Sequence, residues 1–258
     1  MRIMEDKRRT LSEPNAVHNT LQPEGNIAGI SRSYTYDATV DPASRERRSK
    51  ALLEAAETGA TPRVRNLLTS GADVHYCKPT GETALWLAAT RGTDECVRLL
   101  VDAGSNTNAR AGDYNDPPLH RAAAGGWQDA VRTLLQARGI DKDGTSDLGW
   151  TALHCAAYGD NAAVIVILAK HGCSVNVVAS KQGTPLHVAA WYHNLLAVKA
   201  LVQSGADVVA TNKEGCTPVQ WARRSDWNQS FEDDRELVID FLQSVEKSRK
   251  SKKKWWSF

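Results

Sequence analysis

Cysteine is scarce in this sequence and scattered along it. The five cysteines are an odd number, and no two of them form a C-x-x-C pair. This usage argues against a small disulfide-framed domain and against a zinc knuckle. A reducing compartment is the simpler expectation, so we expect an intracellular protein of the cytoplasm, the nucleus or both.

Long hydrophobic runs are also missing. The first residues, MRIMEDKRRT, contain no apolar core of signal-peptide length, and no stretch approaches the roughly 18 apolar residues of a membrane span. The remaining composition, 41% hydrophobic and 24% charged, is that of an ordinary soluble protein. A chain of 258 residues suffices for one extended domain or two compact ones, and we expect a monomer.

Positive charge is in deficit along most of the chain and concentrated at its end. Residues 51–246 carry 17 basic and 23 acidic side chains, whereas residues 247–258 carry 6 basic ones and no acidic one. Contact with phosphates needs clustered Lys and Arg. The body of the chain is therefore not expected to bind nucleic acid.

Motifs for catalysis and metal binding are absent as well. There is no phosphate loop, no pair of catalytic carboxylates and no metal-ligand spacing. His154 precedes Cys155, but neighbours on a helix point about 100° apart, so they do not form a nucleophile and its base. The stretch 141–147, DKDGTSD, resembles a calcium loop but lacks the glutamate at the twelfth place. We expect no enzyme, no cofactor and no metal.

An internal repeat fills the middle of the chain. The phrases ETALWLAAT, DPPLHRAAA, WTALHCAAY, GTPLHVAAW and CTPVQWARR align with one another. Their fourth members recur at intervals of 34, 34, 33 and 33 residues, a period typical of solenoid proteins. These aligned positions are Leu85, Leu119, Leu153, Leu186 and Val219.

Each repeat predicts two short helices. In the fifth unit Thr184 supplies an N-cap hydroxyl, and Pro185 is suited to the first turn because it has no N–H to leave unbonded. Leu186 and the alanines after it mark one face of this helix, Leu201 marks a second helix, and Gly205 ends it. Helices of about ten residues are not stable alone, so stacking of the units must stabilise them.

The phrases TPLHVAA, TALHCAA and SGADV, at this period, resemble ankyrin repeats. The resemblance implies an all-α repeat fold, an α-solenoid of about six units joined by β-hairpin-like turns. It further implies that His120, His154 and His187 bond between the backbones of adjoining turns. The expected units are 49–78, 79–112, 113–146, 147–179, 180–212 and 213–246, with divergent capping units at both ends. Residues 1–48 are expected to be a disordered segment, and residues 247–258 a separate tail.

The resemblance also implies a non-enzymatic protein-interaction module, a scaffold or adaptor with a concave binding face. The residues that follow the two alanines of each first helix are expected on that face. The residue before the threonine position of each repeated phrase is expected there too, for example Asp116, which precedes Pro117 at that position. We expect Trp150, Tyr158 and Trp191 to share one surface, because large aromatics where the fold does not need them often anchor partners. The alternative is that they shield a groove. Trp86 and Trp221 are interpreted as packing residues. The predicted partner-binding residues are Arg91, Tyr114, Trp150, Tyr158, Trp191 and, more weakly, Tyr192.

The basic tail leaves several interpretations open. It can be a solvated end, a nuclear-import signal read by an import receptor, a segment for an anionic membrane surface, or a carboxy-terminal PDZ ligand. An alternative function for the chain is therefore a nuclear or membrane-surface regulator whose tail sets its location. The predicted targeting residues are Lys247, Arg249, Lys250, Lys252, Lys253, Lys254, Trp255 and Trp256.

Overall fold

The computed structural model of the chain describes residues 41–179, 182–225 and 232–255, with Glu232 and residues 250–255 described by their backbone. Most of the segment expected to be disordered, residues 1–40, lies outside this range.

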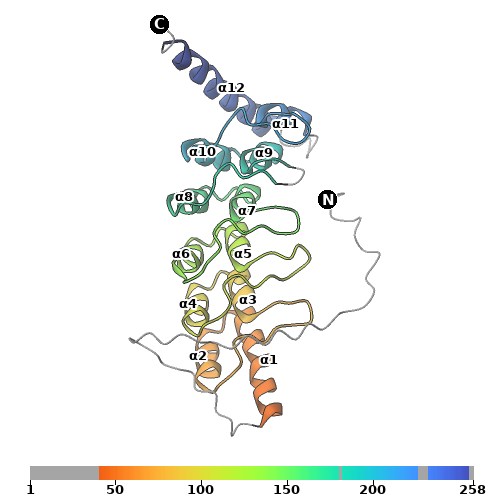
Figure 1. Cartoon of the computed structure of the whole chain (residues 1–258), viewed down its shortest axis with the longest axis vertical. Helices are drawn as coiled ribbons and strands as arrows, with labels where there is room; N and C mark the ends of the chain where they lie inside the picture. Colours follow the sequence, from red (N-terminus) through yellow and green to blue (C-terminus); the bar gives the residue numbers. More distant parts are fainter. Residues whose placement is uncertain (1–40, 180–181, 226–231, 256–258) are drawn as a thin grey trace, which may run out of the picture. The chain divides into compact units, whose positions relative to one another are not determined.

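The described residues form twelve α-helices in six consecutive pairs. Figure 1 shows the first helices of the pairs stacked in one column and the second helices of the first five pairs in another. The first helices are α1 (Pro42–Thr58), α3 (Ala84–Arg91), α5 (Pro118–Ala124), α7 (Ala152–Tyr158), α9 (Pro185–Trp191) and α11 (Pro218–Arg224). The second helices are α2 (Thr61–Thr69), α4 (Asp94–Asp102), α6 (Gln128–Gln136), α8 (Ala162–Lys170), α10 (Leu195–Gln203) and α12 (Glu232–Trp255).

Short turns connect the units, and single antiparallel bridges close three of them, at Cys77–Thr83, Ala111–Asp116 and Ala179–Gly183. No extended strand occurs within the described ranges. The all-α repeat fold of six units is confirmed.

The histidine of the repeated phrase joins neighbouring units. In α7, Nδ1 of His154 accepts the N–H of Thr151 at 3.1 Å, and Nε2 donates to the carbonyl oxygen of Gly183 at 3.1 Å. The equivalent bonds run from His120 to Trp150 and from His187 to Cys216, at 2.8 and 2.9 Å. Burial lowers the pKa of His154 to about 4, which keeps the ring neutral. The implied bonding role of these histidines is confirmed.

Pro117 breaks this arrangement in the third unit. A proline has neither the hydroxyl nor the N–H that Thr151 and Thr184 offer to the histidine three residues later. As a result, Nδ1 of His120 is buried without a hydrogen-bond partner among the described residues.

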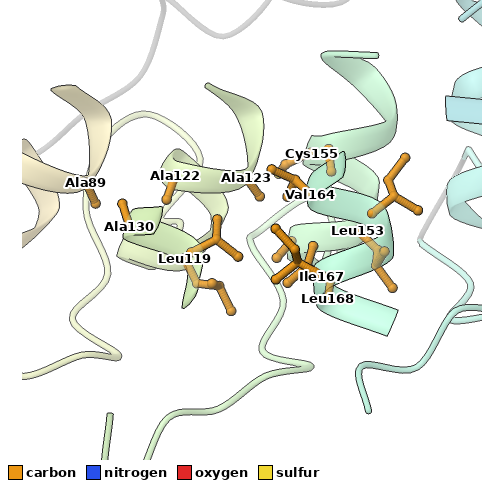
Figure 2. Close-up of a cluster of buried hydrophobic side chains, with 14 of the residues drawn as sticks. Ala89, Leu119, Ala122, Ala123, Ala130, Leu153, Cys155, Val164, Ile167 and Leu168 are labelled. Atoms are coloured by element: carbon orange, nitrogen blue, oxygen red, sulfur yellow. The ribbon is translucent and has the colours of Figure 1, made fainter. Parts of the chain in front are cut away.

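The core lies between the two columns of helices. Leu119 and Leu153 are each 1% exposed, and Figure 2 shows them among the alanines and the aliphatic side chains of the second helices. Full burial of one such leucine contributes roughly 2 kcal/mol. Cys155 belongs to the same cluster, and burial raises the pKa of its thiol, so it acts as a small apolar side chain.

The first helix begins earlier than expected. The predicted boundary at residue 48 is wrong, because α1 starts at Pro42. Asp41 caps this helix by accepting the backbone N–H of Ser44 at 3.0 Å, and Pro42 occupies the first turn. The signal was present in the sequence as an Asp-Pro pair, an N-cap residue before a first-turn proline.

As far as Trp255, the tail continues the last helix and is not a separate segment. The backbone of α12 stays helical from Glu232 to Trp255, and Figure 1 shows its end running past α11. Val238 and Leu242 are fully buried, so the first half of α12 packs on the stack. Arg249, at the start of the basic run, pairs with Asp207 at 2.9 Å.

Candidate protein-binding surface

Three aromatic side chains from two neighbouring units form what we call the aromatic cluster. The ring centroids of Trp150 and Tyr158 are 5.9 Å apart at 54°, and those of Tyr158 and Tyr192 are 4.8 Å apart in an edge-to-face arrangement. Tyr158 is 41% exposed, while Trp150 and Tyr192 are partly buried. The cluster is thus a contiguous aromatic surface that spans the fourth and fifth units.

Tyr114 lies beside the cluster from the turn of the third unit. The pKa of Tyr192 is raised by burial and, to a smaller extent, by the phenols of Tyr158 and Tyr114. The carbonyl oxygen of Tyr114 accepts the N–H of Asp147 at 3.0 Å, which holds this turn against the next one. The structure therefore brings together four of the six predicted residues: Tyr114, Trp150, Tyr158 and Tyr192.

Trp191 takes a different place from the one predicted. Its ring centroid is 4.6 Å from that of Trp221 in the sixth unit, and its carbonyl oxygen accepts the hydroxyl of Ser225 at 2.7 Å. Adjacent residues at a helix end point about 100° apart, so Trp191 faces the following unit and Tyr192 the preceding one. The expectation that Trp191 joins Trp150 and Tyr158, and that Tyr192 lacks such company, is wrong.

Trp86 and Trp221 are core residues, as predicted. They are 7% and 9% exposed, and the Nε1 of Trp86 donates to the carbonyl oxygen of Asp116 at 3.0 Å. Arg224 lies over the Trp221 ring, 5.6 Å from its centroid.

Asp116 and Arg91 also differ from a simple concave-face pattern. Asp116 is 6% exposed and not outward-facing, because its carboxylate accepts Nε of Arg121 at 3.1 Å. Burial raises the pKa of Asp116, and the guanidinium of Arg121 opposes this effect. Arg91 is exposed but lies beside Gly59 in the first unit, on the side away from the aromatic cluster.

The structure adds an exposed aromatic residue that was not predicted from the sequence. Trp127, before α6, is 41% exposed, and its Nε1 donates to the carbonyl oxygen of Thr90 at 3.1 Å. The two following units carry Asn161 and Asn194 at this register, and both donate to carbonyl oxygens of the preceding unit at 2.8 to 2.9 Å. A tryptophan at a position that the next two units fill with asparagine was the available signal.

Within the described residues, no helix is long and apolar enough to cross a membrane. In the same ranges, no three His, Cys, Asp or Glu side chains gather as a metal site would require. In the turn that faintly resembles a calcium loop, Asp143 accepts the N–H and hydroxyl of Ser174 at 2.8 and 2.7 Å, a bond between units.

The stacked helix pairs and their inter-unit histidine bonds define a helical repeat protein. The family model of ankyrin repeats (3 copies) matches residues 52–146 and 138–212, more than half of the chain. The chain belongs to the ankyrin repeat family.

Three curated relatives illustrate the range of proteins in which such repeats occur. The ANK repeat-containing protein nipk-1 of Caenorhabditis elegans is 35% identical over 36% of this chain and 17% of its own length. Human ankyrin repeat and SOCS box protein 16 is 35% identical over 42% of this chain and 24% of its own length. Mouse protein phosphatase 1 regulatory subunit 12A is 32% identical over 57% of this chain and 12% of its own length. The chain thus spans less than a quarter of each of these relatives.

Proposed function

We propose that this chain is a non-enzymatic adaptor or scaffold that binds a partner protein through the aromatic cluster and the neighbouring Tyr114. Ankyrin repeats are generally protein-interaction modules, and the relatives include a protein named as a regulatory subunit. One observation carries the assignment to this surface. The fold does not require aromatic rings there. The position equivalent to Trp150 holds Glu82 in the second unit, and the position equivalent to Tyr158 holds Thr90 in the second unit and Ala124 in the third.

The chemistry of the cluster suits a protein partner. Aromatic side chains offer a large contact area at little conformational cost, and they are enriched among the residues that dominate binding energies. The rings already pack on one another, so they hold their positions before binding. A preformed surface avoids part of the ordering cost of association.

The proposal is tested by affinity purification with the whole chain, followed by affinity measurement on the partner identified. The Trp150→Ala/Tyr192→Ala double variant is compared with wild type and with a matched control, Arg63→Ala, an exposed residue of the first unit. We expect at least tenfold weaker binding for the double variant, with circular dichroism unchanged, and no loss for Arg63→Ala. Equal affinity of the double variant and wild type would remove this surface from the proposal.

The basic end of α12 supports a second proposal, that it sets the location of the protein in the cell. The six basic residues of 247–258 fall on a short length of sequence whose backbone is helical as far as Trp255, and each basic residue near an anionic membrane adds about 1 kcal/mol of attraction. A fluorescently tagged chain is imaged with and without residues 247–258. Loss of nuclear or membrane enrichment on truncation supports a targeting role, and an unchanged distribution leaves the end as a solvated helix.

A further inference from the structure

Trp127 forms a second surface, outside the aromatic cluster, and two glycines make room for it. A Cβ on Gly92 would lie 2.1 to 2.5 Å from three atoms of the indole, so the face of the ring covers this glycine. A Cβ on Gly125 would lie 2.2 Å from the indole Nε1. Together with the hydrogen bond to Thr90, these contacts fix the ring while leaving 41% of the residue exposed.

The stack itself does not need an indole at this position. Asn161 and Asn194 make the equivalent bond to the preceding unit with a short polar side chain, and each is only partly exposed. Trp127 therefore keeps the structural bond and adds a rigid apolar surface that faces solvent. An exposed, fixed tryptophan is a typical anchor for a binding partner.

Two carboxylates lie beside this ring. A shallow groove is lined by Trp127, Gly92 and Gly126 together with Asp94 and Asp129, which lie in the first turns of α4 and α6. Asp94 accepts the hydroxyl of Thr133 at 2.6 Å. Within the described residues, neither carboxylate forms an ion pair.

The basic side chains nearby form no ion pair with these carboxylates among the described residues. Arg98 is engaged with Glu95, and Arg91 lies beside Gly59 in the first unit. Arg132, three residues after Asp129 on α6, is exposed and not paired with it. Acidic residues at helix N-termini stabilise the helices, which accounts for their presence on α4 and α6. It does not account for an exposed indole fixed between them.

We propose that the groove at Trp127 binds an arginine side chain from a basic segment of a partner protein. The guanidinium would pack on the exposed part of the indole and donate to the carboxylates of Asp94 or Asp129. Arginine suits this site because its planar group stacks on aromatic rings and bonds carboxylates with two parallel N–H groups. The inference stands independently of the aromatic cluster.

The test follows the indole N–H resonance of Trp127 by NMR in the whole chain. The probe is the acetylated peptide Gly-Arg-Gly-Arg-Gly, and the matched control peptide carries Gln in place of Arg. We expect a saturable shift with the arginine peptide alone, weakened by added salt.

Two variants of the groove locate the binding by fluorescence anisotropy of the same labelled peptide. Trp127→Asn installs the residue found at this register in the next two units, so the inter-unit bond and the fold are expected to persist. Asp94→Asn/Asp129→Asn removes the charge and keeps the shape. Each is expected to weaken binding at least fivefold, whereas Trp150→Ala/Tyr192→Ala leaves it unchanged, which separates this inference from the proposed function.

Three results would overturn the proposal. They are an equal shift with the glutamine peptide, wild-type affinity in the Trp127→Asn variant, and sedimentation of wild type as a dimer that is lost in the Trp127→Asn variant, which would mean that residues 247–258 of a second copy fill the groove. The same dimer would dissociate when those residues are removed.

Discussion

The Nε2 atom of His154 lies 3.1 Å from the carbonyl oxygen of Gly183, so a buried imidazole of the fourth unit holds the turn of the fifth. Because the ring donates through one nitrogen and accepts through the other, only the neutral form fits this place. Protonation would remove the acceptor for Thr151 and leave a charge in the core.

This arrangement predicts that stability falls with acidification. The pKa of His154 is about 4 in the folded chain and 6.5 in the reference state, so between these values the unfolded chain binds a proton that the folded chain does not. Stability is therefore lost as pH falls from 6.5 toward 4, and His154 alone accounts for about 2 kcal/mol of the loss at pH 5. His154→Gln, which copies Gln220 of the sixth unit, should lose less stability between pH 7 and pH 5 in urea unfolding. Equal losses in both proteins would contradict this explanation.

Pro117→Thr is expected to stabilise the third unit. The backbone at Pro117, with φ −72° and ψ 164°, already matches that of Thr184, with φ −81° and ψ 167°. Threonine would supply both an N-cap and a partner for Nδ1 of His120, and we expect a gain of about 1 kcal/mol. Thermal unfolding measures it, with Thr184→Pro as the reverse change. A lower melting temperature for Pro117→Thr would show that the rigidity of proline outweighs the added bonds.

Gly125→Ala tests how Trp127 is seated. Gly125 has an ordinary φ of −77°, so a methyl group is unfavourable there only because the indole occupies the space. We expect a loss of about 1 to 3 kcal/mol in wild type and little or none in the Trp127→Asn background. A double-mutant cycle by urea unfolding gives the coupling, and additive losses would mean that the indole is not held against this glycine.

Trp191 and Tyr158 are expected to respond in opposite ways to removal. Trp191 stacks on buried Trp221, so Trp191→Ala should lower stability by about 2 kcal/mol or more. Tyr158 is 41% exposed, so Tyr158→Ala should cost less than about 1 kcal/mol while weakening partner binding. Melting temperature and affinity are measured on both variants. A stable Trp191→Ala protein that fails to bind would return Trp191 to the binding surface.

Much of the fold follows from the sequence because the repeat supplies the same information several times. Leu119 and Leu153 are core residues by register alone, and the histidines reach their partners in the manner that the resemblance implies. The start of α1 was missed because Asp41 and Pro42 stand outside the repeated phrase, where only the local cap signal remains.

The candidate surface was harder to predict than the fold. Register identifies which residues leave the core, but it does not say whether a side chain turns toward the preceding or the following unit. Trp191 and Tyr192 both leave the core, but they turn toward different units. Trp191 packs on the ring of Trp221 in the following unit, and Tyr192 packs on Tyr158 in the preceding one. The expectation that Asp116 faces outward fails for a similar reason. Its carboxylate pairs with Arg121, whose guanidinium lies over the ring of Trp86, and register alone does not predict that packing.

The bonds that the repeated histidines and asparagines make between units end on main-chain oxygens. His120 bonds to the carbonyl of Trp150, and Asn194 to those of Ala157 and Tyr158, so any side chain at the accepting position provides the same acceptor. Trp150 and Tyr158 of the aromatic cluster thus accept these bonds through atoms that every amino acid possesses, while the indole of Trp150 adds a side-chain bond to Oε1 of Gln182 at 2.5 Å. Side chains at these positions can diverge without loss of the main-chain acceptors, and such a protein can change the partner it recognises without rebuilding its scaffold.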